Sequence, residues 1–167
     1  MDTIVVGLDE SKGARVAARW AAKQAKQGGA RVLAFHAVPR SGLWILEAAQ
    51  FDTDALLLRL RQELEHDWVA PLREAGVDYT TQLVRGDPAT ELLRVTKRVH
   101  AVMLVIGSKS HSAMADLVVG GTVHKVINRS VIPVVLVPNP PSTKRAAATP
   151  TKKPASPRKR AVRRATS

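Results

Sequence analysis

The sequence predicts a doubly wound α/β domain, in which a five-stranded, mostly parallel β-sheet carries helices on both faces. Five short apolar runs, rich in β-branched residues, alternate with segments of helical periodicity along the first 140 residues. Hydrophobic residues make up 45% of the chain and aromatic residues only 4%, so Val, Leu, Ile and Ala have to build the core, as they do in buried parallel sheets. Strands joined through helices imply right-handed βαβ crossovers.

The first strand and the first helix have clear boundaries. The run IVVGL predicts a strand over residues 4–8, and Ser11 is a suitable N-cap for the helix that follows. Gly28 and Gly29 should end this helix. One face of it collects apolar side chains, namely Val16, Ala17, Trp20, Ala21 and Ala25. We expect this face to pack on the sheet.

A second strand is expected at residues 31–38, followed by a loop that contains Pro39 and Gly42. A long amphipathic helix should come next, because four large apolar side chains recur at a spacing of four residues: Leu60, Leu64, Trp68 and Leu72. This stripe is interpreted as core. Pro71 should kink the last turn of the helix, and Gly76 should end it.

The third strand is expected at residues 78–84, where the alternating pattern suits a position near the sheet edge. Asp87 and Pro88 form an N-cap and N1 pair that opens a third helix. The run AVMLVI predicts a strand at residues 101–106 that is buried on both faces. The last two elements are a helix at roughly 121–130 and a strand at 133–137.

Sheets of this class bind ligands beyond the carboxyl ends of their strands, where the strand order reverses. Three segments should meet there: the turn at residues 7–11, the end of the second strand at 37–39, and the loop that starts at Gly107. This loop, GSKSHSAMADLVVGG, runs into a predicted helix. Its N–H groups and the helix N-terminus together can hold an anion.

Several separate segments resemble the universal stress proteins in order and spacing. They are IVVGLDES at the start, FHAV at the end of the second strand, LVRGDPATELL before the fourth strand, VIGSKS after it, and VHKVINRSVIPVVLVP at the end of the domain. The resemblance covers residues 3–138 and implies the strand order 3-2-1-4-5. It also implies a cytoplasmic stress-response protein that holds ATP at the ends of strands 1, 2 and 4. A homodimer through the fifth strand, 133–137, is implied as well, and that edge needs cover in any case.

The resemblance also implies where the nucleotide would lie. Members that bind nucleotides carry Gly, two residues, Gly, nine residues, Gly, and then Ser or Thr after the fourth strand. Gly107 and Gly120 match this pattern, whereas Ser110 and Gly121 depart from it. The glycines allow close approach of the main chain to phosphates, so the departures leave open whether the site still binds. The residues expected to hold the nucleotide are Asp9, Ala37, Val38, Gly107, Ser108, Lys109, Ser110, Gly120, Gly121 and Thr122.

Two of these residues also have a plainer interpretation. The residue that matches Asp9 contacts the adenosine part in members that bind nucleotides, and the backbone near Ala37 and Val38 matches the adenine edge. Asp9 could equally help Ser11 to cap the first helix. Gly107 could simply allow a tight turn at a strand end.

The sequence predicts a binding protein and not an enzyme. Ser110, His111 and Asp116 have the residue types of a hydrolytic triad, but neighbours in one loop rarely satisfy its geometry, and the G-x-S-x-G context is missing. No residue stands out as a base for attack on phosphate, so a slow ATPase is the weakest hypothesis. The five histidines lack metal-ligand spacing, and the chain has no cysteine.

Basic charge is concentrated at the end of the chain. The net charge is +12, but residues 144–167 hold nine of the 26 Lys and Arg and none of the 14 acids, which leaves +3 for residues 1–143. Residues 141–167 lack large apolar side chains apart from one Val, so this tail should be disordered beyond a domain at 1–140.

The alternative function is a dimeric stress protein that binds no nucleotide and whose tail associates with nucleic acid. The nine cations favour weak, salt-sensitive contact of residues 144–164 with DNA or RNA. A solvated tail and a contact with an anionic membrane surface remain open too. We expect no membrane span, because no segment is apolar over the roughly 18 residues that one needs.

Overall fold

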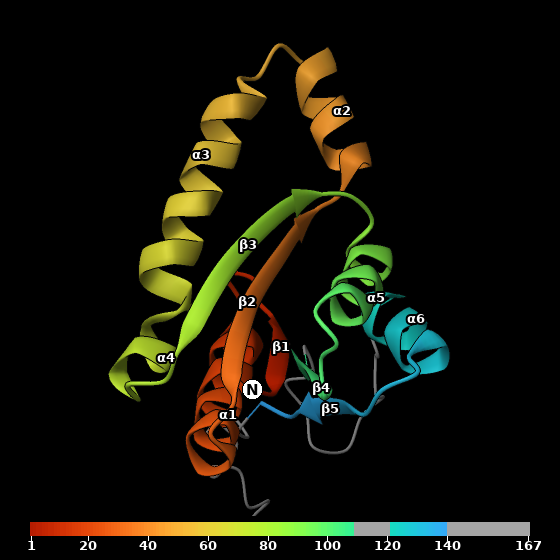
Figure 1. Ribbon diagram of the computed structural model, residues 1–167. Helices are drawn as coiled ribbons and strands as arrows, with labels where there is room; N and C mark the ends of the chain where they lie inside the picture. The colour runs from red at the N-terminus through yellow and green to blue at the C-terminus, as the bar shows by residue number, and fades with distance from the viewer. Residues whose placement is uncertain (109–120, 140–167) are drawn as a thin grey trace, which may run out of the picture.

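The computed structural model of the protein contains a five-stranded sheet in which each pair of neighbouring strands is parallel (Figure 1). It describes residues 1–108 and 121–139; the predicted tail at 141–167 lies outside them. The strand order β3-β2-β1-β4-β5 confirms the predicted fold class and order. The strands are β1 (Thr3–Gly7), β2 (Arg31–Val38), β3 (Tyr79–Arg85), β4 (Met103–Gly107) and β5 (Val134–Val137).

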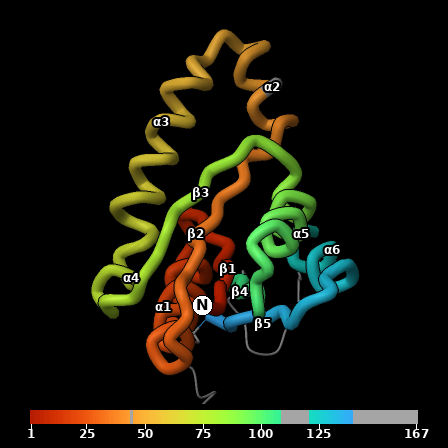
Figure 2. Tube along the Cα trace, in the orientation of Figure 1, coloured from red at the N-terminus to blue at the C-terminus, as the bar shows by residue number. Residues whose placement is uncertain are grey.

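Helices cover both faces of this sheet (Figures 1 and 2). They are α1 (Lys12–Gly28), α2 (Arg40–Ala48), α3 (Thr53–Glu63), the π-helix η1 (Leu64–Trp68), α4 (Ala70–Glu74), α5 (Pro88–Arg98) and α6 (Gly121–Arg129). One hydrophobic cluster joins α1, η1 and α4 to one face, and a second joins α5 and α6 to the other. Ile4 and Val6 belong to the first cluster and Val5 to the second, as the alternation of a strand buried on both faces requires.

The first helix forms as the sequence predicts. The Ser11 Oγ accepts a hydrogen bond from the Ala14 N–H at 3.1 Å, and Gly29 ends the helix in the left-handed region with φ +64°. Its buried face consists almost wholly of small side chains: Gly13, Ala14, Ala17, Ala18, Ala21, Ala22 and Ala25. These small side chains allow the helix backbone to lie close to the sheet.

Residues 40–48 form α2, which corrects the predicted loop. Pro39 and Gly42 indicated a turn, but Pro39 occupies the N-cap position, and its carbonyl accepts a hydrogen bond from the Leu43 N–H at 3.3 Å. The Leu43 side chain is 4% exposed. Burial of this side chain therefore outweighs the weak local preference for a turn.

The long helix predicted through residues 60–72 is interrupted, which corrects the expectation of one helix with a kink in its last turn. Helix α3 ends at Glu63, the π-helix η1 follows, and α4 begins at Ala70. Pro71 has no N–H, and its ring excludes a regular bond to the carbonyl of Asp67. The chain widens into a π turn before that proline. The stripe is nevertheless core, because three of its members are at most 8% exposed: Leu64, Trp68 and Leu72.

Strand β4 starts later than the predicted 101–106. Ala101 and Val102 precede it, and the Val102 N–H bonds to the Thr3 carbonyl at 2.9 Å, outside the ladder of β1 and β4. Strand β1 likewise ends one residue before the predicted 4–8. Boundaries set by pairing with a neighbouring strand cannot be read from an apolar run alone.

The start of α1 lies directly against the end of β4. A Cβ placed on Gly107 would overlap the carbonyl group of Gly13, and a Cβ on Gly13 would lie 2.5 Å from the carbonyl oxygen of Ser108. Both positions therefore accept only glycine without a shift of the backbone. Backbone packing therefore requires glycine at position 107, in addition to the two roles considered for it from the sequence, close approach to a phosphate and a tight turn.

Replacement of Gly107 by Ala should destabilise the fold by about 1–3 kcal/mol, because the new methyl group meets backbone atoms that cannot rotate away. The measurement is the free energy of unfolding from urea titration. Gly28→Ala, at the other end of α1, is the matched control, since nothing lies within 4 Å of its Cβ position. It should stabilise the helix by about 0.5–1 kcal/mol. Equal effects of the two substitutions would contradict the packing constraint.

Candidate functional site

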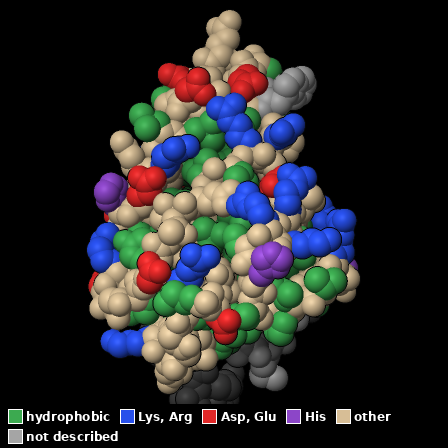
Figure 3. Space-filling model, in the orientation of Figure 1, with side chains coloured by type: hydrophobic (Ala, Val, Ile, Leu, Met, Phe, Trp, Pro, Cys, Tyr) green, Lys and Arg blue, Asp and Glu red, His purple; other side chains and the backbone are tan. Residues whose placement is uncertain are grey.

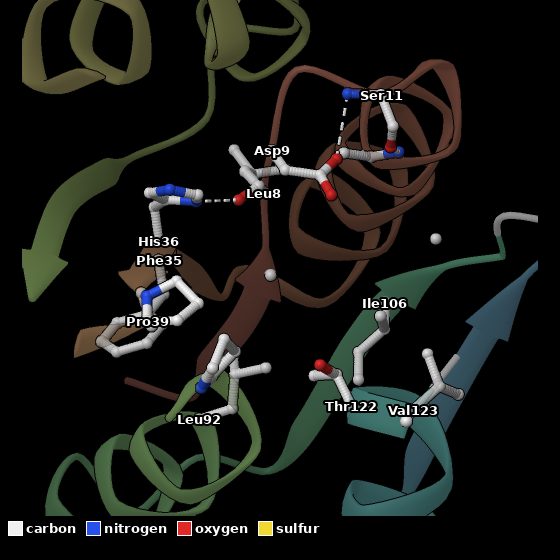
Figure 4. A pocket seen from close by; sticks show the side chains of 16 residues that line it. Leu8, Asp9, Ser11, Phe35, His36, Pro39, Leu92, Ile106, Thr122 and Val123 are labelled. Atoms are coloured by element: carbon white, nitrogen blue, oxygen red, sulfur yellow. Dashed lines mark hydrogen bonds between the residues drawn. The ribbon is translucent and has the colours of Figure 1, made fainter. Parts of the chain in front are cut away.

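A cavity of about 330 Å³ opens at the carboxyl edge of the sheet, where β1, β2 and β4 end (Figure 4). The helices α1, α5 and α6 also reach it with their N-terminal residues. Figure 4 shows three groups of side chains around the cavity: Asp9 and Ser11; Phe35, Pro39 and Leu92; and Ile106, Thr122 and Val123. The site thus forms where the strand order reverses, as doubly wound sheets predict.

Asp9 and Ser11 form the polar side of the cavity. The Ser11 N–H donates to Asp9 Oδ1 at 3.0 Å, while the Ser11 hydroxyl accepts from the Ala14 N–H. The N-cap acceptor of α1 is therefore Ser11, and Asp9 orients the capping residue. The capping interpretation therefore holds in part, since the Asp9 carboxylate supports the helix start. Asp9 also lines the cavity, and its contact with a ligand stays a prediction.

His36 links the end of β2 to the turn after β1. Its Nδ1 lies 2.7 Å from the Leu8 carbonyl oxygen, which can only accept, so Nδ1 carries the proton of this bond. The imidazole ring also makes an edge contact with Trp68, with ring centroids 4.9 Å apart. His36 is thus a packed, hydrogen-bonded residue at the end of β2, and it also lines the cavity.

An apolar wall faces these polar groups. Phe35 and Leu92 are at most 5% exposed, and Ile106 is 8% exposed. Pro39 and Pro88 border the wall at the ends of β2 and α5. Flat apolar surfaces of this kind suit a ring system with little charge.

The contribution of α5 to this wall was not predicted from the sequence. The Asp87–Pro88 pair was recognised as a helix start, and its position after β3 places that start at the carboxyl edge of the sheet. The Asp87 carboxylate accepts from the Thr90 hydroxyl at 2.8 Å and from the Thr90 N–H at 3.0 Å, and Lys125 of α6 lies 3.5 Å from it. This contact ties α5 to α6 beside the cavity.

The predicted site residues separate into three groups. Five of them line the cavity: Asp9, Ala37, Gly107, Gly121 and Thr122. Val38 and Ser108 are not among the lining residues. The Val38 carbonyl accepts from the Gly86 N–H, and the Ser108 N–H donates to the Val137 carbonyl at 2.8 Å. Lys109, Ser110 and Gly120 lie outside the described residues.

Within residues 1–108 and 121–139, no group of three or more His, Asp or Glu side chains could hold a metal ion. No helix in these same ranges has the length and apolar character to cross a membrane.

Residues 1–138 match the sequence model of the universal stress protein family. The chain belongs to this family. It is 26% identical over 147 residues to universal stress protein MJ0531 of Methanocaldococcus jannaschii, with 82% of each chain covered. It is 34% identical over 64 residues to universal stress protein YxiE of Bacillus subtilis, a match that spans 38% of this chain and 43% of that relative.

A solved structure supports the fold of this universal stress protein. The universal stress protein from Archaeoglobus fulgidus in complex with dAMP superimposes with a TM-score of 0.64 at 24% identity, covering 82% of this chain and 98% of that chain. The family assignment confirms the resemblance of the separate sequence segments and places the protein in the stress response.

The titration of Asp87 allows a test of its role as the N-cap of α5 in this stress protein. Hydrogen bonds from the side chain and then the backbone of Thr90 hold the pKa of the Asp87 carboxyl below its ordinary value. A lowered pKa in the folded state adds stability above the unfolded pKa of about 3.9, and this stability is lost as the pH falls through the folded value.

Asp87→Ala should therefore cost about 1 kcal/mol at pH 7, and its deficit relative to the unmodified protein should shrink below about pH 4. Asp87→Asn keeps an acceptor oxygen without the titration, so it should lose less at pH 7. The measurement is urea unfolding between pH 7 and pH 3. A deficit of Asp87→Ala that stays constant over this range would contradict the assignment.

Proposed function

We propose that the protein binds an adenine nucleotide, with ATP as the expected ligand, in the cavity at the carboxyl ends of β1, β2 and β4. The observation that carries the proposal is the pairing of a buried apolar wall with the Asp9 carboxylate and the N-terminus of α6 around one cavity. The size of the cavity, about 330 Å³, lies at the lower end of the range for small-molecule sites.

Each part of a nucleotide has a complement in this site. The wall of Phe35, Pro39 and Leu92 suits the planar base. The Asp9 carboxylate suits the hydroxyls of a sugar, and its bond from the Ser11 N–H fixes its direction. Phosphates would lie at the start of α6, where N–H groups and the helix dipole favour negative charge.

A hydroxyl next to the departure at Gly121 supports the phosphate side of the proposal. On a helix, the Thr122 side chain points about 100° away from that of residue 121, where members that bind nucleotides carry their hydroxyl. The structure places Thr122 on the cavity lining beside Gly121, so a hydroxyl is still present at this edge. A similar protein, from Archaeoglobus fulgidus, was solved with dAMP.

The proposed role is binding without robust turnover, in a cytoplasmic stress-response protein that acts through partners. Of the described lining residues, only Asp9 and His36 carry ionisable side chains. Asp9 orients Ser11, and His36 uses Nδ1 for the Leu8 carbonyl. Both are thus engaged in holding the site together, which suits a nucleotide sensor better than a catalyst of phosphoryl transfer.

Calorimetric titration with ATP and Mg²⁺ tests this function. The full chain and residues 1–140 should both show saturable binding, and Asp9→Ala should weaken it at least about tenfold by removing a charged acceptor. Gly121→Val should abolish binding because the new side chain fills the cavity edge. The fold should accept it, because a Cβ at this position meets no atom of the described residues within 4 Å.

Gly42→Val on α2 is the matched control for Gly121→Val: its Cβ also meets nothing within 4 Å, and Gly42 does not line the cavity. It should bind as the unmodified protein does. The truncated chain is needed because nine tail cations attract ATP nonspecifically. A lack of saturable binding by residues 1–140 at millimolar ATP would refute the proposed function.

The proposal includes a homodimer joined through β5. This strand is at one end of the sheet order, and its residues Val134, Val135 and Leu136 are only partly buried. Val131, just before it, is 91% exposed. Cover of this edge by a second copy would remove an apolar, unpaired strand edge from solvent.

Nucleic-acid binding through the tail is a second candidate function. It is favoured by the nine Lys and Arg, without any acid, in residues 144–167. Such binding would be independent of sequence and would use the folded domain as a dimeric platform.

Fluorescence anisotropy with a labelled DNA duplex tests the second candidate. The full chain should bind with an affinity that falls steeply as salt rises, and residues 1–140 should not bind. The slope of log affinity against log salt reports the number of phosphates neutralised. Equal binding by the full and truncated chains would show that the nucleic-acid contact lies outside the tail.

A further inference from the structure

Helices α2 and α3 form an arm that rises from the sheet beside the ends of β2 and β3 (Figures 1 and 2). Helix α3 has no buried residue. Three large hydrophobic side chains of the arm are more than half exposed: Ile45 at 60%, Phe51 at 65% and Leu58 at 59%. The arm thus presents apolar surface that the described part of the chain does not cover.

One of these three side chains, Leu58, lines a groove between α3 and β3. The groove has a volume of about 430 Å³, and Leu83 and Arg85 of β3 form one side of it. The other side is a stripe of four residues on α3: Asp54, Leu57, Leu58 and Arg61. Their spacing of i, i+3, i+4 and i+7 places them on one face of the helix. Figure 3 shows acidic, hydrophobic and basic side chains close together over α3.

The order of charges along this stripe makes it complementary to itself. A carboxylate lies at one end, two leucines in the middle and a guanidinium at the other end, with the midpoint between Leu57 and Leu58. At a rise of 1.5 Å per residue, Asp54 and Arg61 each lie about 5 Å from that midpoint. A two-fold axis through the midpoint therefore places Asp54 of one copy opposite Arg61 of another, with the leucines in contact.

The charges on the two sides of α3 differ in how they are paired. On the far side, Arg59 bonds to Glu63 at 2.7 Å within the helix. On the stripe, Asp54 contacts Arg85 at 2.9 Å but remains 88% exposed. Arg61 makes no ion pair with any residue of the described ranges. The stripe, unlike the far side, has an acceptor that is accessible and a cation without a partner in the described chain.

We propose that the groove between α3 and β3 binds the α3 helix of a second copy of this chain, antiparallel and two-fold symmetric, with Leu58 of each copy over the groove of the other. Strand β3 is at the opposite end of the sheet from β5. The arm contact is therefore separate from a dimer through β5, and the two together link copies into larger assemblies. The contact also does not involve the nucleotide cavity.

Site-specific disulfide formation tests the arm contact in the full chain. The sequence has no cysteine, so Leu58→Cys introduces a single thiol next to the proposed axis. Mild oxidation should yield a covalent dimer, because residues beside the axis fall within the 4.4–6.8 Å Cα separation that a disulfide needs. Arg59→Cys, one residue away on the far side of α3, is the matched control and should remain largely uncrosslinked.

Charge reversal then tests the pairing. In the Leu58→Cys chain, Asp54→Arg should lower the yield of covalent dimer roughly tenfold, because it places like charges opposite each other. Adding Arg61→Asp should restore the yield. Asp54 and Leu58 are largely exposed, so these variants should keep the fold, which circular dichroism checks.

Two results would overturn the arm contact: equal crosslinking of Leu58→Cys and Arg59→Cys, or a yield of covalent dimer that does not change with Asp54→Arg and Arg61→Asp.

Val134→Pro separates this contact from the β5 dimer. The carbonyls of Pro133 and Val137 accept hydrogen bonds from β4. Successive residues of a strand direct their backbone N–H and C=O groups to opposite sides, so the Val134 N–H points to the free edge of the sheet. Proline is tolerated at such a position. Crosslinking through Cys at position 58 should persist in that variant, and its loss would also overturn the proposal.

Discussion

The contact on which the rest of this structure depends is the approach of two backbones, at Gly13 in α1 and Gly107 in β4. Neither position has room for a Cβ, so the first turn of α1 lies directly on the end of β4. This contact places the turn after β1 beside the end of β4 at one edge of the sheet, with Asp9 and Gly107 on one cavity. The alanine face of α1 continues the same close packing along the sheet.

The cavity combines surfaces that come from different crossovers. Phe35 comes from β2, Leu92 from α5 and Thr122 from α6, while the turn after β1 supplies the carboxylate of Asp9. The polar groups of the site are also structural: Asp9 orients the N-cap of α1, and His36 holds the turn at Leu8. A site whose polar groups already hold the fold together is suited to retain a ligand in a fixed geometry, which fits a binding role in the stress response.

An open parallel sheet leaves one unpaired strand edge at each end, and the two edges of this sheet have different surroundings. Strand β5 is short, with partly buried apolar side chains and an exposed Val131 beside it. Strand β3 has the arm beside it, where α3 shows leucines between opposite charges. Apolar surface at either edge exposes the protein to uncontrolled association unless a defined partner covers it. The two proposed contacts between copies would cover both edges, each through a different surface.

The sequence by itself determined the fold class, the order in which strands and helices occur, the caps at Ser11 and Asp87, and which strand ends border the cavity. These follow from periodicity and from local hydrogen bonding, which act over a few residues. Only the tertiary structure decided that residues 40–48 are helical, that the next helix breaks before Pro71, and that Leu92 forms a wall of the cavity. Each of these depends on contacts between residues far apart in the chain, such as the burial of Leu43, and local patterns carry no information about which distant surfaces meet.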